Sequence, residues 1–276
     1  MKWLHFILSH SIFIAFCAVA LCFQTALLLH INLTIYLYFF IFFSTLCSYN
    51  FYWLLSGYSF AGATMNTFIK KHYSNLIVFL LAAAGMSFTL LKIPKLLPVV
   101  SAGIVLTLLY AVPLLPFKIF HLARKAGLLK TILLAFTWAF VTVYIPYKEA
   151  PIGNFNTLVL LFNARFLFML MLCIIFDARD TKVDKIRGLQ TLTTILKPST
   201  VQYIMLTVFI LFIINGIVLR LYYHEMIQIG ALAVNAILGL TIYYFSLKKQ
   251  GYFFYYFLVD GLMLFSSITI YIASLL

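Results

Sequence analysis

Three aspartates lie within eight positions at the end of one strongly apolar stretch of the chain. Asp177, Asp180 and Asp184 make up half of the six acidic residues of the protein. Residues three, four or seven positions apart share one face of an α-helix, so a helix here gathers the three carboxylates, while Arg179 and Lys182 point elsewhere. Carboxylates this close need a compensating charge, and oxygen-only ligands favour a hard cation. The spacing therefore predicts a site for Mg²⁺.

Lysines accompany these carboxylates in the sequence. Lys185 directly follows the third aspartate, while Lys118 and Lys130 lie in a basic stretch upstream. Carboxylate-bound Mg²⁺ together with fixed cations can bind a diphosphate ester and neutralise it as a leaving group. The sequence thus predicts that the three lysines bind a diphosphate. Two simpler explanations stay open: each lysine could anchor the membrane topology, and the aspartates could form a solvated, salt-bridged helix end.

The composition excludes a soluble globular domain. Of the 276 residues 65% are hydrophobic and 9% are charged, and the mean hydropathy is +1.09. Such values are typical of an integral membrane protein surrounded by lipid, and we expect one transmembrane domain over residues 1–276. The net charge of +13 does not indicate nucleic-acid binding, because membrane topology explains the distribution of the basic residues.

Apolar windows of about 20 residues predict nine membrane-spanning helices, the first of them retained rather than cleaved as a signal peptide. The predicted spans are 4–29, 34–56, 74–91, 96–114, 131–146, 155–176, 199–219, 226–247 and 253–275. With the N-terminus in the cytoplasm, most of the 19 Lys and Arg residues fall in inside segments. This bias predicts a cytoplasmic N-terminus and an outside C-terminus, and it places the connections 57–73, 115–130 and 177–198 on one face.

The segment 176–192, which contains the three aspartates, resembles the second aspartate-rich motif of the UbiA-type membrane prenyltransferases. Two shorter matches accompany it. Tyr110-x-x-Pro113, followed by Lys118, is similar to a Tyr/Pro/Lys element after the fourth helix of that family. Asn50 stands where the first aspartate-rich motif of the family begins.

The resemblance implies an all-α polytopic fold, with nine transmembrane helices around a central cavity. It also implies that a polyprenyl diphosphate binds through Mg²⁺, ionises to an allylic carbocation and is coupled to a lipophilic, often aromatic, acceptor. The implied membrane is a bacterial inner membrane, with its lipids as further partners. The residues implied for metal binding and catalysis are Asp177, Asp180 and Asp184, and those implied for diphosphate binding are Asn50, Tyr110, Lys118, Lys130 and Lys185.

One departure from the family pattern keeps other functions open. The first motif of the family reads Asn-x-x-x-Asp-x-x-x-Asp, but here Leu54 and Tyr58 follow Asn50 at those positions. A non-catalytic protein that binds an isoprenoid or a quinone is therefore an alternative. A small transporter is a weaker alternative, because the sequence shows no matched pair of broken helices. We expect Asn50 and Asp177 to face one another across the cavity. Each lies at the inside end of a predicted span, and the two spans run in the same direction through the membrane.

Overall fold

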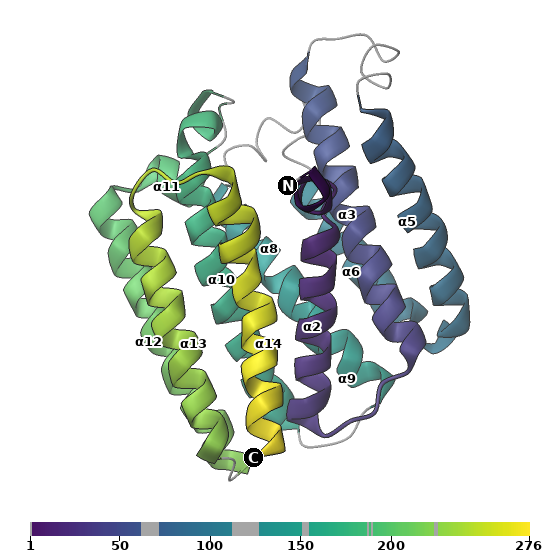
Figure 1. The fold of residues 1–276 in the computed structure, drawn as a ribbon, viewed down its shortest axis with the longest axis vertical. Coiled ribbons are helices and arrows are strands. Elements are labelled where there is room, and N and C mark those ends of the chain that lie inside the picture. The colour runs from purple at the N-terminus through teal and green to yellow at the C-terminus, as the bar shows by residue number, and fades with distance from the viewer. Residues whose placement is uncertain are drawn as a thin grey trace.

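The computed structural model describes residues 2–61, 72–111, 127–150, 155–186, 188, 190–223 and 226–276. Within these residues the chain forms helices and no strand (Figure 1). The α-helices are α1 (Lys2–Ser9), α2 (Ile12–Leu29), α3 (Ile35–Ala61), α5 (Tyr73–Lys92), α6 (Leu97–Ala111), α8 (Gly127–Ala139), α9 (Ile145–Glu149), α10 (Phe155–Ile186), α11 (Leu192–Ile195), α12 (Pro198–Tyr223), α13 (Met226–Ser246) and α14 (Asp260–Leu275). A 3₁₀ turn, η1 (Pro94–Leu96), precedes α6, and π-helical turns form η4 (Phe140–Tyr144) and η5 (Phe254–Val259).

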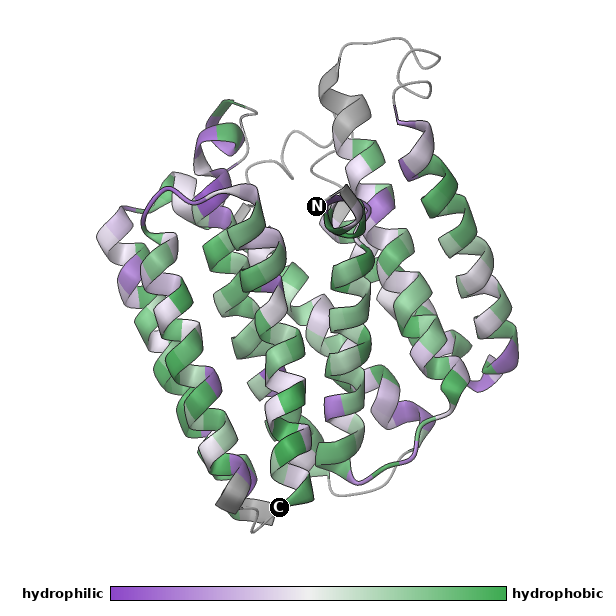
Figure 2. Ribbon diagram, in the orientation of Figure 1, coloured by the Kyte–Doolittle hydropathy of each residue, from purple (hydrophilic) through white to green (hydrophobic). Residues whose placement is uncertain are grey.

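Eight helical stretches within the described ranges are long and apolar enough to cross a membrane. A shorter apolar helix, Pro94–Tyr110, lies where the fourth span was predicted. The prediction of an all-helical, multi-pass membrane protein is therefore confirmed, whereas the count of nine spans is not. Hydrophobic residues cover the lengths of the helices and hydrophilic residues gather toward their ends, as a bilayer requires (Figure 2).

The structure changes the boundaries of two predicted spans, 4–29 and 155–176. The predicted span 4–29 is two helices, because the chain breaks at His10 and Ser11, where Ser11 has a left-handed backbone with φ of 62°. The predicted span 155–176 is part of a longer helix, α10, which continues to Ile186. The three aspartates therefore lie on the last turns of a continuous helix and not in a connection.

Neighbouring helices follow one another around the bundle. Helix α2 packs on α14, α14 on α13, α13 on α12, α12 on α10 and α10 on α8. Helix α8 contacts α6, which η1 connects to α5, and α5 packs on α3, which returns to α2 (Figure 1). The predicted arrangement of helices around a central space therefore holds for the described part of the chain.

Gly85 of α5 packs tightly against Phe43 of α3. A methyl group added there would stand 2.8 Å from ring carbons of Phe43. Overpacking of this kind typically costs about 1–3 kcal/mol. We therefore expect Gly85→Ala to lower the free energy of unfolding by about 1–3 kcal/mol, although alanine is the better helix former. Denaturant titration of the purified protein in detergent micelles measures the change.

Gly239→Ala on α13 is the matched control. Apart from the adjacent residues and the backbone of its own helix turns, no atom of the described residues lies within 4 Å of a Cβ added at Gly239. The change is expected to be neutral or to stabilise by about 0.5–1 kcal/mol, because alanine loses less backbone entropy in a helix. Equal stabilities of the two variants would show that Phe43 does not restrict Gly85.

Candidate functional site

Residues of α2, α3, α6, α8, α10 and α14 line a cavity of about 630 Å³. This volume lies within the usual range for pockets that bind small molecules, roughly 300–1,000 Å³. Most of the lining is apolar or aromatic. The charged residues at one end of it, here called the charged end, are Lys130, Asp177, Arg179, Asp180 and Asp184.

All three predicted aspartates belong to the charged end, as their helical spacing predicted. Asp177 is held from two sides. Its Oδ2 accepts a hydrogen bond of 2.5 Å from Thr131 Oγ1 of α8, and its backbone oxygen accepts one of 2.8 Å from Thr193 Oγ1 of α11. The short helix α11 begins with a capping box formed by Thr191 and Thr194, and Thr193 holds it beside the end of α10 by bonding Asp177 and Thr181. Asp177 is thus bonded to two neighbouring helices, through its side chain to α8 and through its backbone to α11.

Lys130 and Tyr110, both predicted from the sequence, meet at this end of the cavity. The Lys130 Nζ atom lies 5.4 Å from the centre of the Tyr110 ring and 3.2 Å from the hydroxyl oxygen of Tyr52. The two tyrosine rings stack with their centres 5.1 Å apart. Tyr52 was not singled out from the sequence, because it lies 78 positions before Lys130 and belongs to no motif. Together the three side chains present a cation and hydroxyl groups to the cavity.

Arg179 corrects one expectation from the sequence. It does not point away from the aspartates, because its Nε and Nη2 atoms each donate a hydrogen bond of 2.7 Å to the carboxylate of Asp180. The same guanidinium lies over the rings of Phe176, Tyr255 and Tyr256, with its carbon 4.8, 5.2 and 4.9 Å from their centres. A long side chain can curl back along its own helix in this way, and a bidentate pair with stacked rings holds it there.

The carboxylates share the cavity but do not form a ready metal site. Both oxygens of Asp180 accept from Arg179, and Oδ2 of Asp177 accepts from Thr131. Over the described ranges of the chain, no group of three or more His, Cys, Asp or Glu side chains is placed to hold a metal ion. As arranged, these residues do not fit a preformed Mg²⁺ site made by the protein alone, so the metal site stays a prediction.

Three other predicted residues lie away from the cavity or outside the described chain. Asn50 is fully buried, is not among the residues that line the cavity, and donates from its side-chain nitrogen to the backbone oxygens of His10 and Leu46. The expectation that Asn50 faces Asp177 across the cavity is therefore wrong: the amide instead holds the break between α1 and α2. Lys185 is exposed and does not line the cavity. Lys118 falls outside the described residues.

Two polar residues for which the sequence assigned no role lie inside the bundle. Arg165 is buried, and its Nη2 atom donates to the backbone oxygen of Leu21 and to Thr25 Oγ1, so it does not extend to the outer surface. Asp260 is also buried and lines the main cavity. Only their charge within an apolar span marks them in the sequence.

Comparison with solved structures places this architecture among known folds. No protein-family model and no curated protein matches the sequence. The structure is similar to the apo structure of a UbiA homolog from Aeropyrum pernix K1, with a TM-score of 0.59 and 11% sequence identity. The match covers 94% of this chain and 96% of that one. The chain therefore has the fold of a UbiA homolog over nearly its whole length.

Proposed function

We propose that the protein binds a polyprenyl diphosphate in its cavity and transfers the polyprenyl group to a lipophilic, aromatic acceptor. The observation that carries the proposal is a single cavity with an apolar interior and a charged end. A polyprenyl diphosphate has the same division, with a long apolar chain and an anionic head. The fold of a UbiA homolog and the sequence around Asp177 support the same reading.

The apolar interior would hold the isoprenoid chain. Side chains from several helices contribute to it, among them Phe40, Met86 and Leu134. Burial of apolar groups contributes about 0.8 kcal/mol for each methylene, so chain burial would supply much of the affinity. The depth of this interior would limit the chain length that the protein accepts.

The charged end would hold the diphosphate. Lys130 brings a fixed cation, and the hydroxyl of Tyr52 lies 3.2 Å from it. When the bond between the allylic carbon and the diphosphate oxygen breaks, the electron pair leaves with the diphosphate. A cation placed beside that oxygen stabilises the charge as it develops. The acceptor then forms a carbon–carbon bond with the allylic cation, and its ring carbon releases a proton.

Magnesium enters the proposal only as an ion bound together with the diphosphate. Mg²⁺ keeps several waters and is usually held by one or two carboxylates with substrate phosphates, rather than by protein ligands alone. Asp177 and Asp184 of the charged end would be those carboxylates. The proposed orientation has a cytoplasmic N-terminus and an outside C-terminus, in a bacterial inner membrane, which places the charged end on the cytoplasmic face.

A non-catalytic isoprenoid- or quinone-binding protein is the second candidate. Two observations favour it. Asp180, one of the predicted metal ligands, is paired with Arg179, and Leu54 stands where the resemblance implies an aspartate. Such a protein would keep the cavity and its affinity for the chain without breaking the diphosphate bond.

Diphosphate release from purified protein separates the two candidates. The protein in lipid nanodiscs is given allylic diphosphates of increasing chain length with lipophilic phenols, with and without Mg²⁺. We expect release of diphosphate and formation of a prenylated phenol in the presence of Mg²⁺, and only weak binding of Mg²⁺ to the protein alone by calorimetry. Binding of a non-hydrolysable diphosphate analogue without any release would favour the second candidate. Absence of both binding and release would overturn the proposal.

A further inference from the structure

A single carboxylate lies in the apolar part of the cavity, on a helix other than the one that carries the aspartates. Asp260 is the first residue of α14, is 4% exposed and belongs to the cavity lining. It follows Tyr256 by four positions, about one helical turn, and the Tyr256 ring stacks on Arg179 of the charged end. Asp260 therefore lies about one turn deeper than the charged end. An ionisable residue at such a place within a span is costly, which makes it a candidate for function.

The local backbone turns Asp260 toward the cavity. A π-helical turn, η5, ends at Val259 immediately before it, and such turns change the register of a helix and occur frequently at functional sites. The backbone oxygen of Asp260 is the acceptor for Cys17 Sγ, at 3.5 Å. In the part of the chain that the structure describes, no hydrogen bond or ion pair to the Asp260 carboxylate is found. Arg179, the cation that acts on it electrostatically, is engaged by Asp180.

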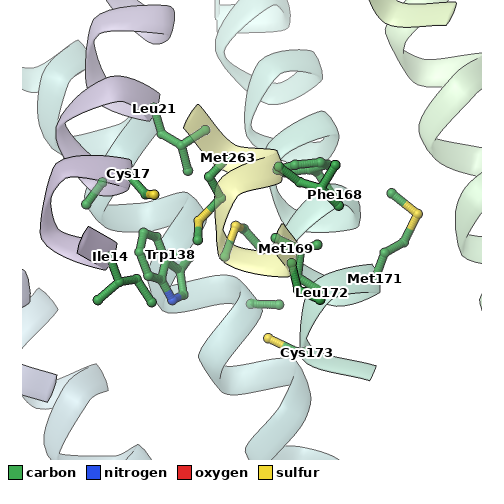
Figure 3. Close-up of a cluster of buried hydrophobic side chains, with 14 of the residues drawn as sticks. Ile14, Cys17, Leu21, Trp138, Phe168, Met169, Met171, Leu172, Cys173 and Met263 are labelled. Carbon is green, nitrogen blue, oxygen red and sulfur yellow. The ribbon is translucent and has the colours of Figure 1, made fainter. Parts of the chain in front are cut away.

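The surroundings of Asp260 restrict what its carboxylate can bind. Figure 3 shows a core cluster that contains Ile14, Cys17, Trp138, Met169 and Met263, all apolar or weakly polar, and Cys17 of this cluster contacts the backbone of Asp260. Tyr49, which carries a hydroxyl, packs beside this cluster with its ring against that of Trp138. A hard metal ion needs several oxygen ligands, and these five side chains supply none. A single acceptor in an apolar pocket instead suits one hydrogen-bond donor on an otherwise apolar molecule.

We infer that Asp260 accepts a hydrogen bond from the phenolic hydroxyl of a lipophilic acceptor and so fixes the acceptor ring beside the diphosphate end of the cavity. The inference rests on the proposed function and names the acceptor class of the same cavity. The indole of Trp138 and the thioether of Met169 provide flat and polarisable surface for an aromatic ring. A phenol that donates to a carboxylate gains electron density on its ring carbons, which are the atoms that would attack an allylic cation.

Paired ligands that differ only in the donor test the inference. Binding of 4-nonylphenol and of its methyl ether, 4-nonylanisole, is measured by calorimetry on the full-length protein in nanodiscs. We expect the wild type to prefer the phenol by roughly 10- to 100-fold, since the ether leaves the buried carboxylate without a donor. Asp260→Leu, which is similar in size and has no acceptor, should bring the ratio close to one. Equal binding of phenol and ether by the wild type would overturn the inference.

Two further variants keep the result interpretable. Asp260→Asn retains a neutral acceptor oxygen, so a preference of only a few-fold is expected, because bonds to charged acceptors are roughly twice as strong. If either variant kept the full wild-type preference for the phenol over the ether, a group other than Asp260 would accept the hydrogen bond from the phenol hydroxyl. Ser267→Ala is the matched control: Ser267 is buried on the same helix, donates to the Met263 backbone oxygen and does not line the cavity. The preference for the phenol should survive this change.

A non-hydrolysable geranylgeranyl diphosphate analogue separates failure of this inference from failure of the proposed function. The analogue should bind equally well to the wild type and to Asp260→Leu. If the analogue binds but the phenol is not preferred, the role of Asp260 is wrong, while the diphosphate binding that the proposed function requires is retained. If the phenol is preferred through Asp260 but the analogue does not bind, the deep site holds a hydroxyl-bearing lipid and the proposed function fails.

Discussion

Replacing Lys130 with methionine is expected to lower the rate of diphosphate release on the order of a hundredfold. The change keeps the length of the side chain and removes the cation that lies 3.2 Å from the Tyr52 hydroxyl. One well-placed group that stabilises charge developing in a water-poor site is typically worth about that factor. Turnover is measured at saturating substrate, so that the loss is in the chemical step and not in binding of the apolar chain.

Lys182→Met is the control for the Lys130 variant. Lys182 is an exposed lysine on α10 that does not line the cavity, so its replacement should leave the rate unchanged. Circular dichroism and thermal unfolding establish that both variants are folded. A Lys130→Met protein with wild-type turnover would exclude this lysine from the chemistry, and an equal loss in both variants would indicate a general effect of positive charge.

Replacing Trp138 with alanine is expected to lower the free energy of unfolding by about 3–5 kcal/mol, the usual cost of truncating a buried aromatic residue. Trp138 is 6% exposed, forms part of the cavity wall and meets the Tyr49 ring edge to face, with ring centres 6.2 Å apart. Unfolding in detergent micelles with increasing denaturant provides the measurement.

Trp3→Ala serves as the control, because Trp3 is 83% exposed and its loss removes little packing. Its effect on the free energy of unfolding should stay within about 0.5 kcal/mol. If the two variants lost similar amounts of unfolding free energy, the prediction for Trp138 would be contradicted. Neighbouring side chains would then have filled the space of Trp138, or its packing would contribute little to stability.

The helical elements were predictable because lipid imposes a simple rule on sequence. A span needs about 20 apolar residues, and the chain shows this pattern repeatedly. The break at His10 and Ser11 was not predictable, because neither residue is a glycine or a proline and the apolar run continues past them. A helix at the three aspartates was predicted from their spacing, but its continuity with the apolar span was not, because hydropathy marks where the lipid ends and not where the helix ends.

The site was predictable where it depends on spacing along one helix, where the motif resemblance supplied Tyr110 and where the basic stretch supplied Lys130. The three aspartates of α10 share a face because of their intervals, and the structure brings all three to the cavity. The partners of these residues come from elsewhere in the chain. Tyr52 belongs to α3 and Tyr255 to η5, and their positions beside Lys130 and Arg179 follow from helix packing, which no single segment encodes. The pairing of Arg179 with Asp180 depends on the side-chain conformation of Arg179, which the sequence alone does not predict.

The position of Asn50 changes how a genetic experiment on this protein should be interpreted. Its amide nitrogen donates to the carbonyl of His10, at the junction of the first two helices, 3.0 Å away. A substitution there would loosen the attachment of the N-terminal helix to α3 while leaving every side chain of the charged end intact. A screen that scores only product would record such a variant as catalytically dead. Measuring the amount of assembled protein beside the product would identify it instead as a defect in assembly.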